Sequence, residues 1–384
     1  MKLRPLLAAL AGIALLPACS SDKNVEPPAE LVDLRPVLAV EEVWSERVGG
    51  GGEKLRLALG LALQDGTLFA ASRAGDVRAM QAGSGRTVWQ SDTKLELSAG
   101  PAVGEGTVVV GTNDGDLLAL EASSGELRWR VSLSSEVLAR PLVAGGSVIV
   151  RTVDGRLQAL EIADGRSRWT VEETVPRLSL RGTAAPVRVG DAVVCGFDNG
   201  KVLAVAIDTG ELVWQSQLGR PTGRTELERL ADVDAEVQVS GQDVYAVGYQ
   251  GRVAMMSLDS GQIWWSRDVS SYRGLALDDD QVYVASSDGD VVAIRRRDGS
   301  IVWQQEGLKR RSLSAPAVQG SAVVVGDFDG YLHWMDRDTG TFVARKRLGG
   351  ARISAAPLVG DGMLYVIDED GSIAAYRSGA RLER

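Results

Sequence analysis

The sequence predicts an all-β protein, an eight-bladed β-propeller of four-stranded antiparallel blades. One observation is a glycine that recurs about every 40 residues, followed ten residues later by a second glycine and four later by a tryptophan. The other is a set of short runs rich in Val and Leu, separated by Asp, Asn and Gly. Repetition at this period indicates one supersecondary unit used many times.

One repeat unit is well represented by residues 98–131, SAGPAVGEGTVVVGTNDGDLLALEASSGELRWRV. Four apolar runs (PAV, TVVVG, LLALE and ELRWRV) alternate with turns at 104–106, 113–115 and 123–125. Short Val- and Leu-rich runs bounded by such turns are typical of strands, and Asp-Gly and Asn-Gly supply the positive φ of tight hairpins. Four strands per unit match a propeller blade, whereas a helical solenoid would show a sustained period of 3.6.

The repeat markers count the blades. The first glycine occurs eight times, at Gly75, Gly115, Gly155, Gly200, Gly251, Gly289, Gly330 and Gly371. The second glycine occurs at Gly85, Gly125, Gly165, Gly210, Gly261, Gly299 and Gly340, and the tryptophan at Trp89, Trp129, Trp169, Trp214, Trp265 and Trp303. We expect each tryptophan on the outermost strand, where its ring spans the gap to the next blade rather than stacking on a ligand.

The ends of the chain predict how the ring closes. The last unit has three strands and no tryptophan, while an unpaired strand around Trp44 (EEVWSERV) precedes the first unit. The N-terminal strand is therefore expected to complete the last blade, so that residues 41–384 form one closed propeller without exposed edges. The seventh unit has Ala344 in the tryptophan position, so its outer strand is expected to pack differently.

The first 18 residues have the pattern of a signal peptide. A short basic start precedes an apolar stretch at 6–16, which is too short to span a bilayer. The sequence 16–19, LPAC, resembles a bacterial lipoprotein cleavage box, although Pro17 is a less usual occupant. We expect cleavage before Cys19 and lipidation of that residue; the alternative is an ordinary secreted protein with a stray cysteine. Residues 19–40, with prolines among charges, are predicted to be a lipidated flexible tether.

Charge argues against nucleic acid as a partner. The chain has 42 basic and 51 acidic residues, and removal of the signal peptide leaves a net charge of about −11. Such a surface is also unsuited to electrostatic adsorption on anionic lipid, so the acyl anchor is the predicted membrane link.

Residues for catalysis or metal binding are scarce. The cysteines are Cys19 and Cys195, the single histidine is His333, and no CxxC, HExxH or Walker-type pattern occurs. The aspartates at 278–280 and 327–329 fall at predicted hairpin turns, where Asp is favoured for backbone reasons rather than for calcium. We therefore predict no catalytic residue, no metal and no cofactor.

Two connections break the repeat spacing. The distance between first glycines is 38 to 41 residues in most units, but 45 from Gly155 to Gly200 and 51 from Gly200 to Gly251. The extra residues, 175–182 and 223–234, fall in connections leaving blades three and four, on the face of the Asp-Gly turns. Insertions on one face are where repeat proteins place binding sites. Alternatively, the two loops pack on each other, with Arg181 paired to Asp232 or Asp234.

The motifs resemble a known family. The tandem repeats are similar to those of quinoprotein-type eight-bladed propellers. Within that group, the lipoprotein box, LSLRG at 178–182, TELERLADVD at 225–234 and GYLHWMD at 330–336 resemble the BamB family, lipoproteins of the outer-membrane β-barrel assembly machinery. The resemblance covers nearly the whole mature chain. It implies a non-enzymatic scaffold that contacts the POTRA domains of BamA through Leu178, Leu180, Arg181, Asp232 and Asp234.

Location and further partners also follow from resemblance. Ser20 is not the Asp that retains enteric lipoproteins in the inner membrane, which implies the periplasmic face of the outer membrane. Strand edges or the ring face could also receive unfolded outer-membrane proteins. One alternative is a pyrroloquinoline-quinone dehydrogenase, but such enzymes typically carry adjacent cysteines, and Cys195 has no partner cysteine. The other is a propeller that binds an envelope polysaccharide or another envelope protein.

Overall fold

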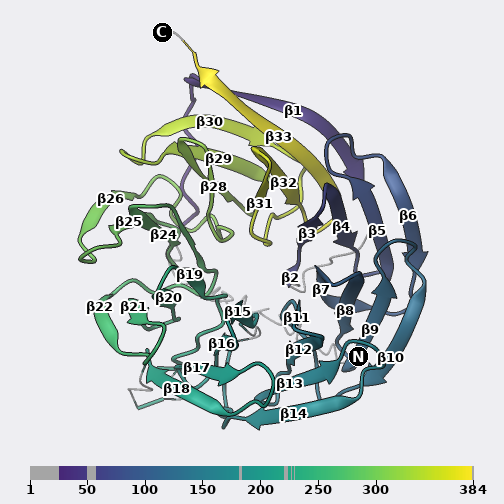
Figure 1. Cartoon of the computed structure of the whole chain (residues 1–384). Helices are drawn as coiled ribbons and strands as arrows, with labels where there is room; N and C mark the ends of the chain where they lie inside the picture. Colours follow the sequence, from purple (N-terminus) through teal and green to yellow (C-terminus); the bar gives the residue numbers. More distant parts are fainter. Residues whose placement is uncertain are drawn as a thin grey trace, which may run out of the picture.

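The predicted propeller is confirmed. A computed structural model of the chain describes residues 26–49, 58–180, 184–219, 224–225, 227–228 and 230–382. All regular structure in these ranges is β, and eight sheets surround a central axis (Figure 1). No helix in the described ranges is long and apolar enough to cross a membrane.

Blades one to four follow one another along the chain. Blade one consists of β3 (Leu61–Gln64), β4 (Thr67–Ala71), β5 (Asp76–Gln81) and β6 (Thr87–Asp92). Blade two consists of β7 (Leu97–Gly104), β8 (Thr107–Thr112), β9 (Asp116–Glu121) and β10 (Leu127–Ser132). Blade three consists of β11 (Leu142–Ala144), β12 (Ser147–Arg151), β13 (Arg156–Glu161) and β14 (Ser167–Glu172). Blade four consists of β15 (Val187–Val189), β16 (Ala192–Gly196), β17 (Lys201–Ala206) and β18 (Leu212–Gln217).

Blades five to eight complete the ring. Blade five consists of β19 (Gln238–Ser240), β20 (Asp243–Val247), β21 (Val253–Ser257) and β22 (Ile263–Arg267). Blade six consists of β23 (Leu275–Leu277), β24 (Gln281–Ala285), β25 (Val291–Arg295) and β26 (Ile301–Gln305). Blade seven consists of β27 (Ala317–Gln319), β28 (Ala322–Gly326), β29 (Tyr331–Asp336) and β30 (Phe342–Arg347). Blade eight consists of β31 (Leu358–Gly360), β32 (Met363–Ile367), β33 (Ser372–Arg381) and β1 (Leu38–Arg47).

The two ends of the chain close the ring as expected. β1 pairs antiparallel with β33 over its whole length, from Leu38 opposite Arg381 to Arg47 opposite Ser372 (Figure 1). Trp44 lies opposite Ala375 and so occupies the outer-strand position of blade eight. One addition was not anticipated: β2 (Ala58–Leu59) pairs in parallel with β7 and gives the sheet of blade two a fifth strand.

Seven tryptophans join successive blades in the way the repeat predicts. Each indole N–H donates to a backbone carbonyl of the next blade at 2.5–2.9 Å: Trp44 to Ala82, Trp89 to Ala122, Trp129 to Ile162, Trp169 to Ile207, Trp214 to Leu258, Trp265 to Arg296, and Trp303 to Arg337. The ring covers the second repeat glycine of that blade. A Cβ at Gly125, for example, would lie 2.4 Å from the ring of Trp89, which explains the glycine.

The hydrophobic core lies between the blades rather than at one centre. Eight clusters of buried residues occupy the eight interfaces. Inner strands pack through alternating Val, Leu and Ala side chains, as in Val108 and Val110 of blade two against Phe69 of blade one. Each blade therefore depends on its neighbours for burial, which is the physical basis of the closed array.

Blade seven departs from the repeat, as the sequence indicates. The large ring belongs to Trp334 on β29, directly opposite Ala344 on β30. Trp334 is fully buried, stacks edge-on against Tyr376 of blade eight and donates to the Gln319 side chain at 2.9 Å. Gln319 in turn donates to the Tyr376 carbonyl at 3.0 Å. Blades seven and eight are thus joined by different groups from the other interfaces.

The propeller begins before the predicted boundary at residue 41. β1 starts at Leu38, which is buried between blades seven and eight. The preceding residues 26–37, assigned from the sequence to the tether, make hydrogen bonds to blade seven and its loops, including Ala29 N–H to the Lys309 carbonyl and Val37 N–H to the Val343 carbonyl, both at 2.9 Å. Prolines and charges in this segment suggested that it is solvated. Its carbonyls instead accept hydrogen bonds from Arg311 and Arg345, which lie 282 and 313 positions further along the chain.

Candidate functional site

The two long connections lie on one face of the ring, as the spacing predicts. The first links β14 to β15 and the second links β18 to β19. Each packs against an Asp-Gly-type turn: Glu173 N–H donates to the Gly155 carbonyl at 3.0 Å, and Leu218 N–H to the Gly200 carbonyl at 2.9 Å. Both connections therefore lie on the face of the ring that carries the Asp-Gly-type turns, here called the loop face.

Asp232 joins the two connections. Its carboxylate accepts a hydrogen bond from the backbone N–H of Leu180, 52 residues earlier in the chain. The second connection is itself held in place, because Val233 N–H donates to the Phe197 carbonyl at 3.2 Å and Leu230 and Val233 are buried. Asp232 is fully buried. The structure thus shows the loops packing on each other through Asp232, which acts on the backbone of the first loop.

Apolar side chains on both connections are exposed. Leu178 is 43% exposed and Leu227 is 62% exposed, while Leu180 is half-buried. Leu230, three residues after Leu227, is buried instead. Arg181 lies outside the described residues, so its predicted pairing with Asp232 or Asp234 stays a prediction.

Three buried or half-buried carboxyl groups lie beneath the connections: Asp198, Asp232 and Asp234. Burial raises the pKa of Asp232 to about 6, and burial together with the neighbouring Asp198 and Asp232 raises the pKa of Asp234 well above its ordinary value. Burial also raises the pKa of Asp198, which forms an ion pair with Arg151 at 3.1 Å. The Arg151 guanidinium stacks 4.4 Å from the Phe197 ring centre. Within the described residues, the carboxyl groups of Asp198 and Asp234 interact with the buried Arg151 guanidinium, and Asp232 interacts with Asp198.

Residues of the two long connections also line the central channel. A cavity of about 1110 Å³ on the axis is lined by the inner strands and by Leu180, Asp234 and Glu236. Glu236 binds Arg140 at 2.9 Å, which ties the connection after blade four to the connection after blade two. The candidate site therefore continues from the exposed leucines to the mouth of the channel.

The groups that could have carried chemistry are used within the fold. Cys195 is fully buried, and burial raises the pKa of its thiol to about 12, so it is no nucleophile at neutral pH. His333 is buried against Asp327 at 2.9 Å. Asp278 accepts from two turn amides and from Tyr283. In the part of the chain that the structure describes, no group of three or more His, Cys, Asp or Glu side chains is arranged to hold a metal ion.

Comparison with known proteins decides the family. The family profile described as "Outer membrane protein assembly factor BamB" matches residues 73–305 and 302–382. The chain belongs to the BamB family. A BamB of Pseudomonas aeruginosa is 47% identical over 371 residues, covering 96% of this chain and 98% of that protein. The BamB of Escherichia coli is 35% identical over 390 residues, covering 97% and 99%.

Solved structures agree with this assignment. The crystal structure of BamB from Moraxella catarrhalis has a TM-score of 0.82 and 31% identity, covering 88% of this chain and 100% of that one. A quinohemoprotein alcohol dehydrogenase from Comamonas testosteroni shares the propeller with a TM-score of 0.67, covering 90% of this chain and 78% of its own. Its identity is only 14%, so that likeness shows the fold alone.

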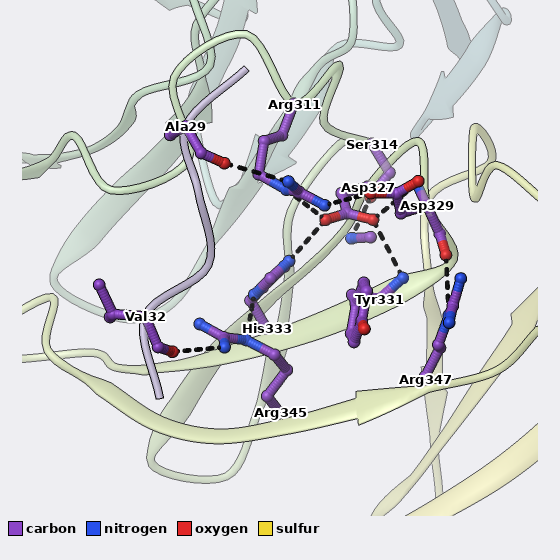
Figure 2. Close-up of polar contacts among 11 residues, drawn as sticks. Ala29, Val32, Arg311, Ser314, Asp327, Asp329, Tyr331, His333, Arg345 and Arg347 are labelled. Atoms are coloured by element: carbon purple, nitrogen blue, oxygen red, sulfur yellow. Dashed lines mark hydrogen bonds and ion pairs between the residues drawn. The ribbon is translucent and has the colours of Figure 1, made fainter. Parts of the chain in front are cut away.

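Sequence reasoning missed one cluster away from the two long connections. Arg311, Asp327, His333 and Arg345 form a buried and half-buried network on blade seven that reaches residues 29 and 32 (Figure 2). The available signal was a lone histidine in a strand six residues after an aspartate in a turn. That spacing is compatible with a hairpin contact, but the arginines come from other elements, so only the fold reveals the network.

Proposed function

We propose that this protein is a non-enzymatic lipoprotein of the outer-membrane protein assembly machinery, anchored through Cys19 at the periplasmic face of the outer membrane. We further propose that it binds the POTRA region of BamA and so assists the folding and insertion of outer-membrane proteins. Membership of the BamB family, whose relatives are named outer membrane protein assembly factors, supports the general role.

The observation that carries the partner-binding part is the Asp232–Leu180 hydrogen bond. It holds the first long connection on the second, next to the exposed Leu178. An exposed leucine on a backbone that is fixed in place loses little conformational entropy on binding, and a well-packed apolar side chain near the centre of an interface carries much of its affinity. Membrane anchoring adds a high local concentration, so that the contact itself can be of modest affinity.

The five candidate residues then divide into two roles. In this proposal Leu178, Leu180 and Arg181 contact BamA, and Asp232 holds the backbone of Leu180 in place. Asp234 lies at the channel mouth, and one of its carboxylate oxygens is shielded from solvent and has no hydrogen-bond partner among the described residues.

The test is capture of the BamA periplasmic region by the tagged mature protein. Leu178→Asp, Arg181→Ala and Asp234→Ala are each expected to lower capture at least tenfold. The matched control is Leu127→Asp, because Leu127 is 58% exposed on the outer strand of blade two, away from the loop face. Circular dichroism confirms that each variant is folded. No capture by wild type, or equal capture by the three loop variants and the control, would show that the contact lies elsewhere.

Asp232 separates the two roles. Asp232→Asn keeps an oxygen that can accept from Leu180 N–H, so capture is expected to survive, whereas Asp232→Leu removes the acceptor and is expected to reduce it. Loss of capture in Asp232→Asn would instead indicate that an uncharged oxygen does not suffice to hold the first connection in place.

A further inference from the structure

Residues 26–37 are docked on the propeller. Arg311 donates to the Ala29 carbonyl at 3.1 Å and Arg345 to the Val32 carbonyl at 2.8 Å (Figure 2). At the C-terminal end of the segment, Leu382 N–H donates to the Val37 carbonyl at 2.8 Å. At its start, Glu26 forms an ion pair with Arg310. Contacts thus run from one end of the segment to the other.

Apolar contacts follow the same path. Leu31 packs on the core between blades six and seven, and Val37 packs on the core between blades seven and eight. The segment therefore crosses the whole of blade seven. Val32, between these anchors, is 68% exposed and takes part through its backbone carbonyl.

The side chains of the two arginines that bind the segment are fixed by contacts with other residues of blade seven and its loops. Arg311 is buried, with Nε 2.7 Å from Asp327 and Nη2 2.9 Å from Asp329, which leaves Nη1 to meet Ala29. Arg345 donates through Nε to Nδ1 of His333 at 3.2 Å, and its Nη1 meets Val32. Because blade seven supplies this geometry, docking the segment requires little further ordering of the receptor side.

We propose that residues 26–37 form a strap that sets the orientation of the propeller on the membrane, with the edge between blades six and seven facing the lipid surface; the inference rests on the lipid anchor of the proposed function. Arg310 and Arg311 lie in the connection from β26 to β27, on the loop face. Glu26, the first described residue, forms its ion pair with Arg310 at this edge.

Chain length makes the constraint tight. Only residues 20–25 separate Cys19 from Glu26, so at about 3.5 Å per residue the anchor lies within roughly 25 Å of this edge. A chain free to residue 40 would reach roughly three times as far. The two long connections leave blades three and four, two to three blades away around the ring. Lipid and protein partner therefore meet different parts of the loop face and can be bound together.

The first experiment tests the strap in the soluble, unlipidated protein. Hydrogen exchange of the Ala29 and Val37 amides is expected to be at least tenfold slower than in an unstructured peptide, because both amides are bonded to blade seven and its loops. Leu31→Asp is expected to abolish the protection of Ala29, while Val32→Asp, at an exposed position, leaves it unchanged. Exchange of both amides at the peptide rate in wild type would overturn the strap.

The second experiment tests the orientation. The lipidated protein is placed on phosphatidylethanolamine and phosphatidylglycerol vesicles with an acceptor dye on the headgroups, and a donor dye is attached at Glu306→Cys or Ser134→Cys. Glu306 is exposed beside the strap exit, and Ser134 is exposed in the connection four blades away. Cys195 is buried and so does not compete for the dye. Transfer is expected to be stronger from position 306, and Leu31→Asp is expected to reduce the difference.

The outcomes separate the strap from the scaffold role. Equal transfer from both positions, or no lipid on Cys19, would overturn the orientation. Protected amides with unequal transfer, in a protein that fails to capture BamA, would support the strap and contradict the proposed partner.

Discussion

Trp334 lies opposite Ala344 in blade seven, which reverses the pairing found in the other blades. Elsewhere the tryptophan stands on the outer strand and faces a smaller residue on the third strand, as Trp89 faces Ala79. The reversal coincides with a change in the next blade. β33 continues straight for ten residues without a hairpin turn, because its partner β1 comes from the other end of the chain. Blade eight thus lacks the turn carbonyl and glycine on which an outer-strand tryptophan docks.

The docking tryptophans are expected to contribute strongly to stability. Trp265→Ala should lower the free energy of unfolding by about 3–5 kcal/mol, because the ring is buried over Gly299 and bonded to the Arg296 carbonyl. The neighbouring Trp264 is 56% exposed, and Trp264→Ala should change it by no more than about 0.5 kcal/mol. Urea denaturation measures both. Similar losses for the two variants would contradict the docking role.

The interface between blades seven and eight contains one buried bridging amide, that of Gln319. Gln319→Ala should cost about 2–4 kcal/mol, because it leaves the Trp334 N–H and the Tyr376 carbonyl without their partner. The matched control is Gln90→Ala, because Gln90 is exposed on the outer strand of blade one and its side chain bonds to Asp76 on β5. That change should stay within about 0.5 kcal/mol in the same urea experiment. If Gln319→Ala lowers the free energy of unfolding no more than the control does, other contacts hold blades seven and eight together.

Asp232 should lower stability at neutral pH. Its pKa is raised in the folded protein to about 6 from 3.8, so its contribution is fully favourable below 3.8 and is lost as pH rises through 6. Asp232→Asn removes this dependence and should be more stable than wild type at pH 7.5 by up to about 3 kcal/mol. The gain should be smaller at pH 5. Equal stability of the two proteins at both pH values would indicate that the carboxylate is compensated.

His333 should remain neutral at pH 7. Burial lowers its pKa below 6.5, against the opposing effect of Asp327. Because Arg345 donates to Nδ1, the proton resides on Nε2 and is donated to Asp327. A lowered folded pKa means that this group's contribution to stability is present above 6.5 and is lost as pH falls through the folded value.

The chain has a single histidine, so NMR of the untagged protein follows this ring without overlap. The expected titration midpoint lies below 6.5, with nitrogen shifts of the tautomer protonated on Nε2. A midpoint above 6.5 would show that Asp327 outweighs burial.

The repeat spacing was sufficient for the blade count, the docking tryptophans, the closure by the strand around Trp44 and the location of the long connections. These features depend on contacts that recur between neighbouring units at a constant interval. The same residue type therefore appears at the same position of each repeat. The exception at Ala344 was visible in the sequence, but its replacement by Trp334 was not, because residues 334 and 344 become neighbours only when β29 pairs with β30.

An eight-bladed ring could be predicted from the sequence alone. The sequence also shows an excess of acidic residues, no recognised catalytic motif and a start that resembles that of a lipoprotein. The tertiary structure decided what the individual polar residues do. It buried Asp232 beneath Leu180, which a spacing argument cannot distinguish from an exposed contact. It also placed residues 26–37 on blade seven, since the arginines that hold them lie about 280 to 310 positions away. Local sequence specifies strands and turns, whereas burial and long-range pairing exist only after the ring has closed.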